Sequence, residues 1–222
     1  MTFFGPDGAG KSTQVRLLVD ALNARNVRCK VAWIRALHTF AYALHRILLA
    51  AGYYRIAVNV QGREYFELDL KRIPALRRIW PIIELFSMAP LIITRVKIPS
   101  LLGMTVVCER YTIDSIPSIT YITENDEFHR SLPARILLAM QAPDYVGINL
   151  DCDYETVSSR RGRDTEPEDF IDTQRTFYAR VSARMNALKI DTSKHSLQET
   201  HEIILGYLAS RNGFSAMSAR VG

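Results

Sequence analysis

Hydrophobic positions recur with two different periods, and the two kinds of stretch alternate along the chain. Short apolar runs typical of strands occupy residues 2–4, 28–34, 104–108, 145–150 and 188–191. Longer stretches have one apolar face: Val15, Leu18, Val19 and Leu22 recur at the i, i+3, i+4, i+7 spacing of a helix. The alternation predicts an α/β fold, a three-layer α/β/α arrangement with a roughly five-stranded parallel sheet and helices on both faces.

Further helical patterns cover residues 37–51, 73–95, 133–140, 168–188 and 197–208. In the second of these, Pro74 suits the first helical turn, whereas Pro81 and Pro90 are expected to kink or break the helix. Residues 53–70 alternate only in part, which predicts either a hairpin or a mobile loop. The chain from residue 215 onward is expected to be a frayed tail.

Length and composition set limits on the kind of protein. We expect one domain over residues 1–222, because 48% of the residues are hydrophobic and can fill a core. The three cysteines lie far apart in apolar surroundings, which indicates a reducing, cytoplasmic location. The apolar window 79–96 is interrupted by charges and prolines, so a buried helix is expected in place of a membrane span.

The N-terminus gives a further expectation. Only four residues precede Gly5, which leaves no room for a signal peptide. A first strand of this kind usually runs to about five or six residues, so a trimmed and a complete native start both stay open as alternatives.

The net charge is +5, from 28 basic and 23 acidic residues. Segment 36–80 contributes much of it, with seven basic side chains against three acidic ones. A basic balance suits phosphorylated small molecules and nucleic acid equally well, so charge alone does not decide between these partners.

The strongest chemical signal lies at residues 5–13, Gly-Pro-Asp-Gly-Ala-Gly-Lys-Ser-Thr, which fit G-x-x-x-x-G-K-[ST]. In such a loop the backbone N–H groups turn inward around phosphates, and the lysine reaches the β- and γ-phosphates. The hydroxyl of Ser12 can bind Mg²⁺, and the following helix directs its N-terminal dipole at the phosphates. The alternative is a glycine turn with an incidental lysine. The pattern predicts that the chain binds a nucleoside triphosphate.

Charged residues follow several of the predicted strands. Arg35 comes after the second strand, and Glu109 and Arg110 come after the third. Ligands of open parallel sheets bind at these carboxyl ends, where a cation can hold an anionic substrate. The basic run 160–163 then suits a flap over phosphate. The alternatives are a surface arginine, a structural ion pair and a solvated basic face.

Together these residues resemble the thymidylate kinase family of P-loop nucleoside monophosphate kinases. The resemblance covers most of the chain in order: the loop 5–14, Arg35, Leu-Phe-Ser at 85–87, Glu-Arg-Tyr at 109–111 in place of Asp-Arg-Tyr, the strand 143–151, and the arginines of 160–163 within an expected LID at 158–169. It implies ATP and Mg²⁺ as donor and metal, small-molecule nucleotides as substrates, and a homodimer; a nucleic-acid partner is not implied.

The resemblance also implies residue roles. ATP would be bound by Pro6, Asp7, Gly8, Ala9, Gly10, Lys11, Ser12, Thr13 and Arg160. The acceptor would be bound by Asp7, Arg35, Phe86 and Arg110, with Phe86 stacking on the base; a core position is the alternative for Phe86. Ser12 and Glu109 would hold the metal. Catalytic roles would belong to Asp7, Lys11, Glu109, Arg110, Arg161 and Arg163.

Three departures from the family pattern concern the acceptor. Pro90 stands where an arginine would read thymine, residues 114–121 lack the usual Ser-x-x-Ala-Tyr-Gln, and segment 36–80 is enlarged. The leading hypothesis is therefore phosphoryl transfer from ATP with dTMP as acceptor. Open alternatives are a P-loop kinase of another nucleotide or nucleoside and, less favoured, a non-catalytic nucleotide- or nucleic-acid-binding protein.

Overall fold

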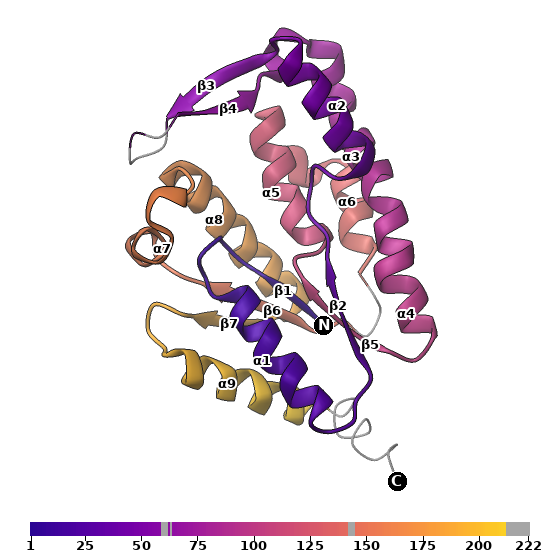
Figure 1. Cartoon of the computed structure of the whole chain (residues 1–222), viewed down its shortest axis with the longest axis vertical. Coiled ribbons are helices and arrows are strands. Elements are labelled where there is room, and N and C mark those ends of the chain that lie inside the picture. Colours follow the sequence, from indigo (N-terminus) through magenta and orange to yellow (C-terminus); the bar gives the residue numbers. More distant parts are fainter. Residues whose placement is uncertain (59–61, 63, 142–144, 212–222) are drawn as a thin grey trace.

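A computed structural model describes residues 1–58, 62, 64–141 and 145–211. Its main sheet has five parallel strands in the order β2-β5-β1-β6-β7 (Figure 1). These strands are β1 (Thr2–Phe4), β2 (Cys29–Trp33), β5 (Thr105–Glu109), β6 (Gly147–Asp151) and β7 (Leu188–Asp191). The α/β/α architecture with a five-stranded parallel sheet, predicted from the alternating pattern, is confirmed.

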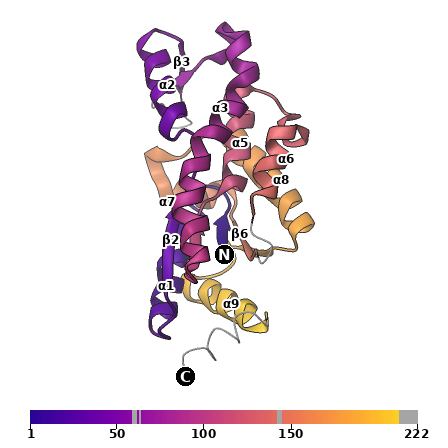
Figure 2. The same ribbon diagram turned by 90° about the vertical axis from the view of Figure 1, so that its right-hand side faces the viewer.

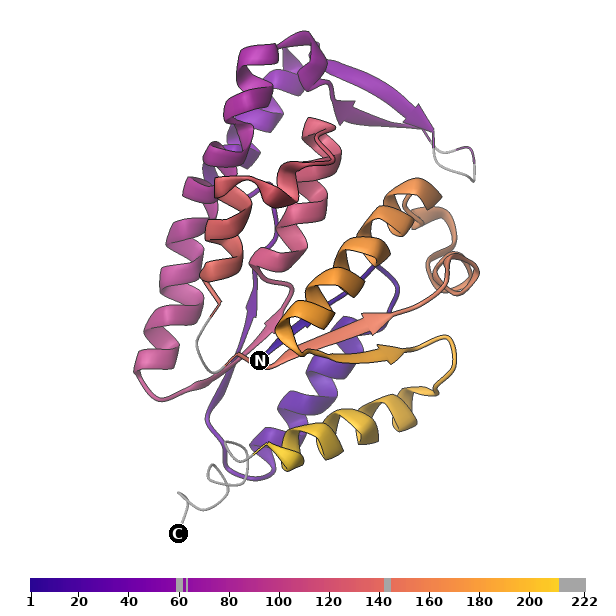
Figure 3. The same cartoon turned by 180° about the vertical axis from the view of Figure 1, so that it is seen from behind.

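Helices cover both faces of the sheet. On one face α1 (Lys11–Asn23) and α9 (Leu197–Ser210) pack together, and their buried residues Leu18, Leu22 and Ile204 share one apolar cluster. The other face carries α3 (Pro74–Ile92), α5 (Thr112–Thr123), α6 (Leu132–Ala139) and α8 (Glu168–Met185), seen from behind in Figure 3. The short helix α4 (Ile98–Leu101) precedes β5, and the short helix α7 (Tyr154–Arg161) follows β6.

All five strands run in the same direction, so their carboxyl ends lie at one edge of the sheet. At this edge the glycine-rich loop leaves β1, Arg35 follows β2, and Arg110 follows β5. The topology thus brings together residues that lie up to a hundred positions apart in the sequence, as expected for an open parallel sheet.

The sequence predicts a kink or a break at Pro81 and Pro90; helix α3 is continuous through both prolines, so the break is wrong. Packing explains the difference: Trp80, Met88 and Ile92 on this helix are buried, and tertiary contacts override local propensity. The regular α-helical geometry is interrupted only after α3, by a π-helical turn at Ile93–Lys97. There the Thr94 hydroxyl donates to the Pro90 carbonyl at 2.8 Å.

By length and composition alone, the stretch Pro74–Leu101 could also cross a membrane. In this structure Trp80, Met88 and Ile92 pack into two clusters of the protein core, and 39% of the most apolar window is buried. Other apolar side chains of the stretch are exposed, among them Ile79, Ile82 and Phe86. The core helices of globular proteins pass the same test of length and composition, so this feature is weak evidence for a membrane span.

Segment 36–80 forms a small unit at one end of the molecule (Figure 2). It comprises α2 (Thr39–Ala50), an antiparallel pair of β3 (Tyr54–Val58) with β4 (Glu64–Leu68), and a turn at Leu70–Arg72 that leads into α3. Of the two alternatives for this region, the hairpin is correct. Its apolar side chains form a separate cluster of Ala41, Leu48, Leu68, Leu70 and Trp80. The frayed tail, and Pro143 and Asp144 of the matched strand, lie outside the described residues.

Candidate functional site

The loop after β1 has the backbone shape that its glycines permit. Gly5 has φ +138°, and a Cβ there would lie 1.9 Å from the carbonyl oxygen of Leu150, so only glycine fits. Gly10 also has positive φ, and it begins α1 without a side-chain cap, which leaves N–H groups free for a ligand. Small-ligand cavities typically measure about 300–1,000 Å³. The cavity lined by Asp7 to Gln14 measures about 520 Å³.

Lys11 points its ammonium group back into this loop. Its Nζ donates to the carbonyl oxygens of Gly5 at 2.7 Å and Pro6 at 2.5 Å. The side chain is only 5% exposed, and desolvation lowers the pKa of Lys11 to about 8. Lys11 is therefore held close to the place where the loop amides converge.

The lowered pKa predicts that ATP binding depends on pH. Below about pH 8 the Lys11 ammonium is charged in the free protein, and above that pH it loses its proton. The affinity for ATP should therefore fall by about tenfold between about pH 7.5 and 9.5. Calorimetric titration with ATP across this range checks the expectation. A Lys11→Arg variant should show a flatter profile because guanidinium stays charged; an equally flat wild-type profile would contradict it.

Four cations surround the carboxylate of Asp7. Lys11 Nζ lies 3.7 Å from it, Arg35 Nη1 3.5 Å and Arg161 Nη1 3.7 Å, and Arg110 forms a further ion pair with it. These cations come from the loop, the end of β2, the end of β5 and α7. Two further carboxylates pair with members of this cluster, Glu166 with Arg35 and Asp114 with Arg110. Four cations thus face three carboxylates, and the remaining positive charge attracts anions.

Arg110 is held by a second carboxylate, that of Asp114 on α5. The Arg110 Nη1 to Asp114 Oδ1 distance is 3.4 Å, and Asp114 also accepts from the Tyr178 hydroxyl at 3.0 Å and the Tyr111 amide at 3.1 Å. Burial raises the pKa of Asp114, and Arg110 opposes this shift. Arg110 also has φ +67°, a strained backbone conformation that is common at functional sites.

Ser12 and Glu109 lie side by side, because the Ser12 hydroxyl donates to the Glu109 carboxylate. A hydroxyl and a carboxylate at a phosphate-binding loop fit Mg²⁺, which usually takes one or two protein oxygens and completes its shell with phosphates and water. Within the described residues no group of three or more His, Cys, Asp or Glu side chains forms a larger metal site. The pair therefore suits a metal that arrives with a nucleotide.

The arginines of the expected LID occupy different places. Arg160 donates to the Gly8 carbonyl at 3.1 Å and to the Thr192 carbonyl at 2.7 Å, beside the phosphate loop. Arg161 belongs to the cluster around Asp7. Arg163 falls in the turn Gly162–Asp164, but its side chain lies outside the described residues.

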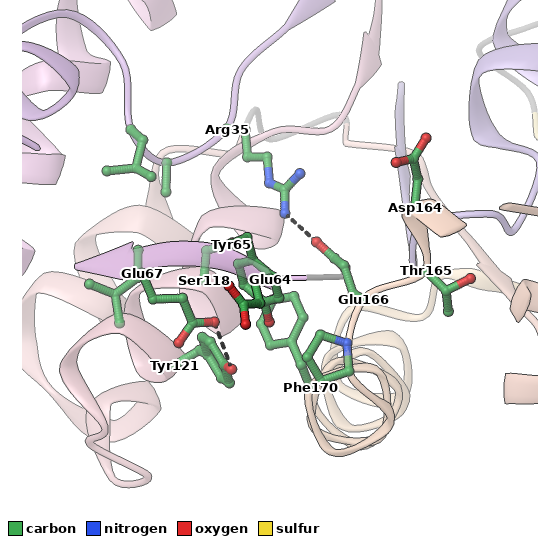
Figure 4. A pocket seen from close by; sticks show the side chains of 14 residues that line it. Arg35, Glu64, Tyr65, Glu67, Ser118, Tyr121, Asp164, Thr165, Glu166 and Phe170 are labelled. Carbon is green, nitrogen blue, oxygen red and sulfur yellow. Dashed lines mark hydrogen bonds and ion pairs between the residues drawn. The ribbon is translucent and has the colours of Figure 1, made fainter. Parts of the chain in front are cut away.

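A second cavity, of about 550 Å³, opens on the other side of Arg35 (Figure 4). Its walls come from β4 with Glu64, Tyr65 and Glu67, from α5, and from the stretch between α7 and α8. Arg35 Nη2 pairs with Glu166 at 3.2 Å. Sequence reasoning missed the β4 residues, since nothing in their local pattern shows that a hairpin folds back over a distant helix.

Phe86 is not brought together with the other predicted site residues. It is 67% exposed on α3 and lines neither cavity. The core alternative is wrong as well, because the ring faces away from the buried side of the helix. The buried positions on this part of α3 are Glu84 and Ser87.

The fold and the site define a P-loop protein of the three-layer α/β/α class, with a phosphate loop and arginines at one edge of a parallel sheet. Over 105 residues the chain is 33% identical to a protein of Methanocaldococcus jannaschii described as "Probable thymidylate kinase". The match covers 46% of this chain and 53% of that protein, so the chain spans about half the length of this relative. No protein-family profile matches the chain.

Proposed function

We propose that the protein transfers the γ-phosphoryl group of ATP to a nucleoside monophosphate, with dTMP as the first candidate acceptor and dTDP and ADP as products. The observation that carries this proposal is the cluster of four cations around Asp7, where a residue that lines one cavity contacts a residue that lines the other. Arg35 lines one cavity, Asp7 and Arg110 line the other, and both arginines contact Asp7. Positive charge therefore lies between a donor cavity and an acceptor cavity, where a phosphoryl group would pass.

The proposed roles follow from position. Lys11 and the loop amides hold the phosphates of ATP, Arg160 lies on the ATP side, and Arg35 holds the acceptor's phosphate. Arg110 and Arg161 neutralise the charge on the transferring group, with Asp7 holding them in place. Such transfer needs little covalent chemistry, so positioning and charge neutralisation supply most of the catalysis.

Ser12 and Glu109 would hold Mg²⁺, which when bound neutralises charge on the β- and γ-phosphate oxygens. The proposed cofactors are thus ATP as donor and Mg²⁺ as metal. Phe86 keeps no proposed role at the base, since it lies outside the cavity that would hold the acceptor.

A kinase of another nucleotide or nucleoside is the second candidate. It is favoured by Glu64, Tyr65 and Glu67, which come from segment 36–80 and line the acceptor cavity. Side chains from the enlarged segment would then determine acceptor choice. The M. jannaschii protein is described as a probable thymidylate kinase, which is why dTMP leads the proposal.

A coupled assay of ADP release tests the proposal, with dTMP, dUMP, dCMP, UMP and thymidine as acceptors. The expected result is ADP release that depends on a monophosphate and is fastest with dTMP. Another preferred acceptor would favour the second candidate. Equal rates with and without acceptor would refute both.

Three further proposals concern partners and location. They are a homodimer, a cytoplasmic location and no nucleic-acid partner. A nucleic-acid-binding protein would instead bind oligonucleotides with an affinity that falls steeply between about 50 and 200 mM salt, which a titration would reveal.

Tyr121→Phe tests whether the cavity beneath β4 holds the acceptor. The Tyr121 hydroxyl donates to Glu67 at 3.1 Å, and Glu67 also pairs with Arg55 at 2.9 Å, so this bond ties the hairpin to α5. Loss of this hydrogen bond should raise the acceptor KM by about three- to tenfold, which is the net effect of one typical hydrogen bond. The ATP KM should stay within about twofold by the same reasoning; a rise in the ATP KM alone would place the acceptor elsewhere.

A further inference from the structure

Residues 35–41, which lead from β2 into the first turn of α2, carry Arg35 and have an unusual backbone. We call this segment the strap. Leu37 has φ +63° and Thr39 has φ +44°, in the left-handed region that non-glycine residues adopt rarely and β-branched residues more rarely still. Such conformations persist only where the surroundings hold them in place.

Helix α3 holds the strap through hydrogen bonds to two of its residues. Both carboxylate oxygens of Glu84 accept from the Leu37 amide, at 2.9 and 3.2 Å. The Ser87 hydroxyl accepts from the Ala41 amide at 2.8 Å, and the Ser87 carbonyl accepts from the Thr39 hydroxyl at 2.7 Å. Two side chains one helical turn apart thus secure the strap along its length.

Glu84 is unusual for its position. It is fully buried on a helix whose other inward-facing residues, such as Trp80 and Met88, are mostly apolar. Burial raises the pKa of Glu84 to about 7, against the opposing effects of the Leu37 amide and Trp80. A buried carboxylate is costly unless it is hydrogen-bonded, so packing alone would favour an apolar residue here.

We propose that Glu84 is a positioning residue: by fixing the Leu37 amide it sets the course of the strap and holds the Arg35 guanidinium at the acceptor cavity. This inference rests on the proposed function, because it assigns Arg35 to the acceptor's phosphate. Glu84 lies on the far side of the strap and does not line the cavity itself. It acts through Arg35 and touches no substrate.

Other ionisable groups around Glu84 must be separated from it in any measurement against pH. On the strap and the elements packed against α3 these are Arg35, His38, Tyr42, His45, Arg46, Lys71, Arg72, Arg95, Lys97, Asp114, Tyr121 and Arg135, with Arg77 and Arg78 on α3 itself. Burial and neighbouring arginines lower the pKa of His38 and His45, so both are neutral near pH 7. The acceptor's own phosphate titrates near pH 6 in every variant.

The test compares Glu84→Gln, which keeps the size of the side chain but removes its charge, with Ser182→Ala as control. Ser182 is also buried, and it accepts from Asn149 at 2.9 Å in a part of the core away from the strap. Glu84→Gln should raise the acceptor KM about tenfold, the value of one hydrogen bond to a charged group, with the ATP KM and kcat changed by less than about threefold. Ser182→Ala should change none of the three.

The dependence of the acceptor KM on pH distinguishes a positioning role of Glu84 from a purely structural one. In the wild type the acceptor KM should rise as pH falls through about 7, where Glu84 takes up a proton and its hold on the Leu37 amide weakens. Glu84→Gln should lack this rise and keep only the change due to the acceptor's phosphate. Equal KM values and equal profiles in the two proteins would overturn the inference.

Hydrogen exchange separates this inference from the proposed function. The amides of Leu37 and Ala41 should exchange faster in Glu84→Gln than in the wild type, and those of α9 should not, whether or not the protein turns over. No turnover by the wild type with any monophosphate would refute the proposed function. Unchanged exchange of the strap amides would refute the role of Glu84 by itself.

Discussion

Replacing Lys11 with alanine is expected to lower kcat by about 10³-fold, the upper range for losing one preorganised donor to the transition state. The ammonium is the buried cation that the loop carbonyls hold at the phosphate cradle, at 2.5 and 2.7 Å. Alanine leaves the loop amides in place but removes the charge that faces the β- and γ-phosphates. The coupled ADP-release assay with saturating ATP and acceptor measures the loss.

The control for this variant is Lys30→Ala, because Lys30 is an exposed lysine on β2, outside both cavities. Its kcat should match the wild type. Thermal unfolding followed by circular dichroism should show that Lys11→Ala remains folded. Turnover retained within about tenfold would refute the assignment of the phosphate loop.

Replacing Arg35 with alanine should raise the acceptor KM by about 10²-fold while the ATP KM changes by less than about threefold, since a guanidinium binds phosphate through two charge-assisted bonds. Arg35 lines the proposed acceptor cavity and not the cavity of the phosphate loop, so its loss should affect the acceptor side first. Initial rates with each substrate varied in turn would separate the two KM values.

Arg46→Ala is the matched control for Arg35→Ala. Arg46 is an exposed arginine on α2, in the same segment 36–80 but away from the cavity, and its loss should leave both KM values unchanged. A change in the ATP KM alone would show that Arg35 serves the donor and not the acceptor. Arg35→Lys should recover only part of the affinity, because an ammonium cannot form the two-pronged contact.

The features predictable from the sequence were those with a local physical cause. The glycine pattern fixes the phosphate loop because Gly5 and Gly10 adopt backbone angles that other residues avoid. The places of Arg35 and Arg110 follow from the rule that parallel strands end at one edge of the sheet. For these residues the structure agrees with the prediction of where they lie, whereas their roles in binding and catalysis stay proposals.

Other features depend on contacts that no local pattern encodes. Glu84 reads as one polar residue in an apolar helix, and only the fold shows that it meets the Leu37 amide 47 positions away. The same holds for Asp114, whose ion pair with Arg110 and hydrogen bond from Tyr178 appear only in the fold. Phe86 shows the opposite error, since a motif match gave it a place at the base and the helix turns it toward solvent.

The separate apolar cluster of segment 36–80 has a practical consequence, because it encloses one of the chain's two tryptophans. Trp80 is sealed inside that cluster, while Trp33 is 41% exposed at the end of β2, edge-on to the ring of His38. Indole emission shifts to longer wavelength in polar surroundings, so the two side chains report on different regions without any added dye. A single-tryptophan version that keeps Trp80 turns the hairpin unit into its own optical sensor.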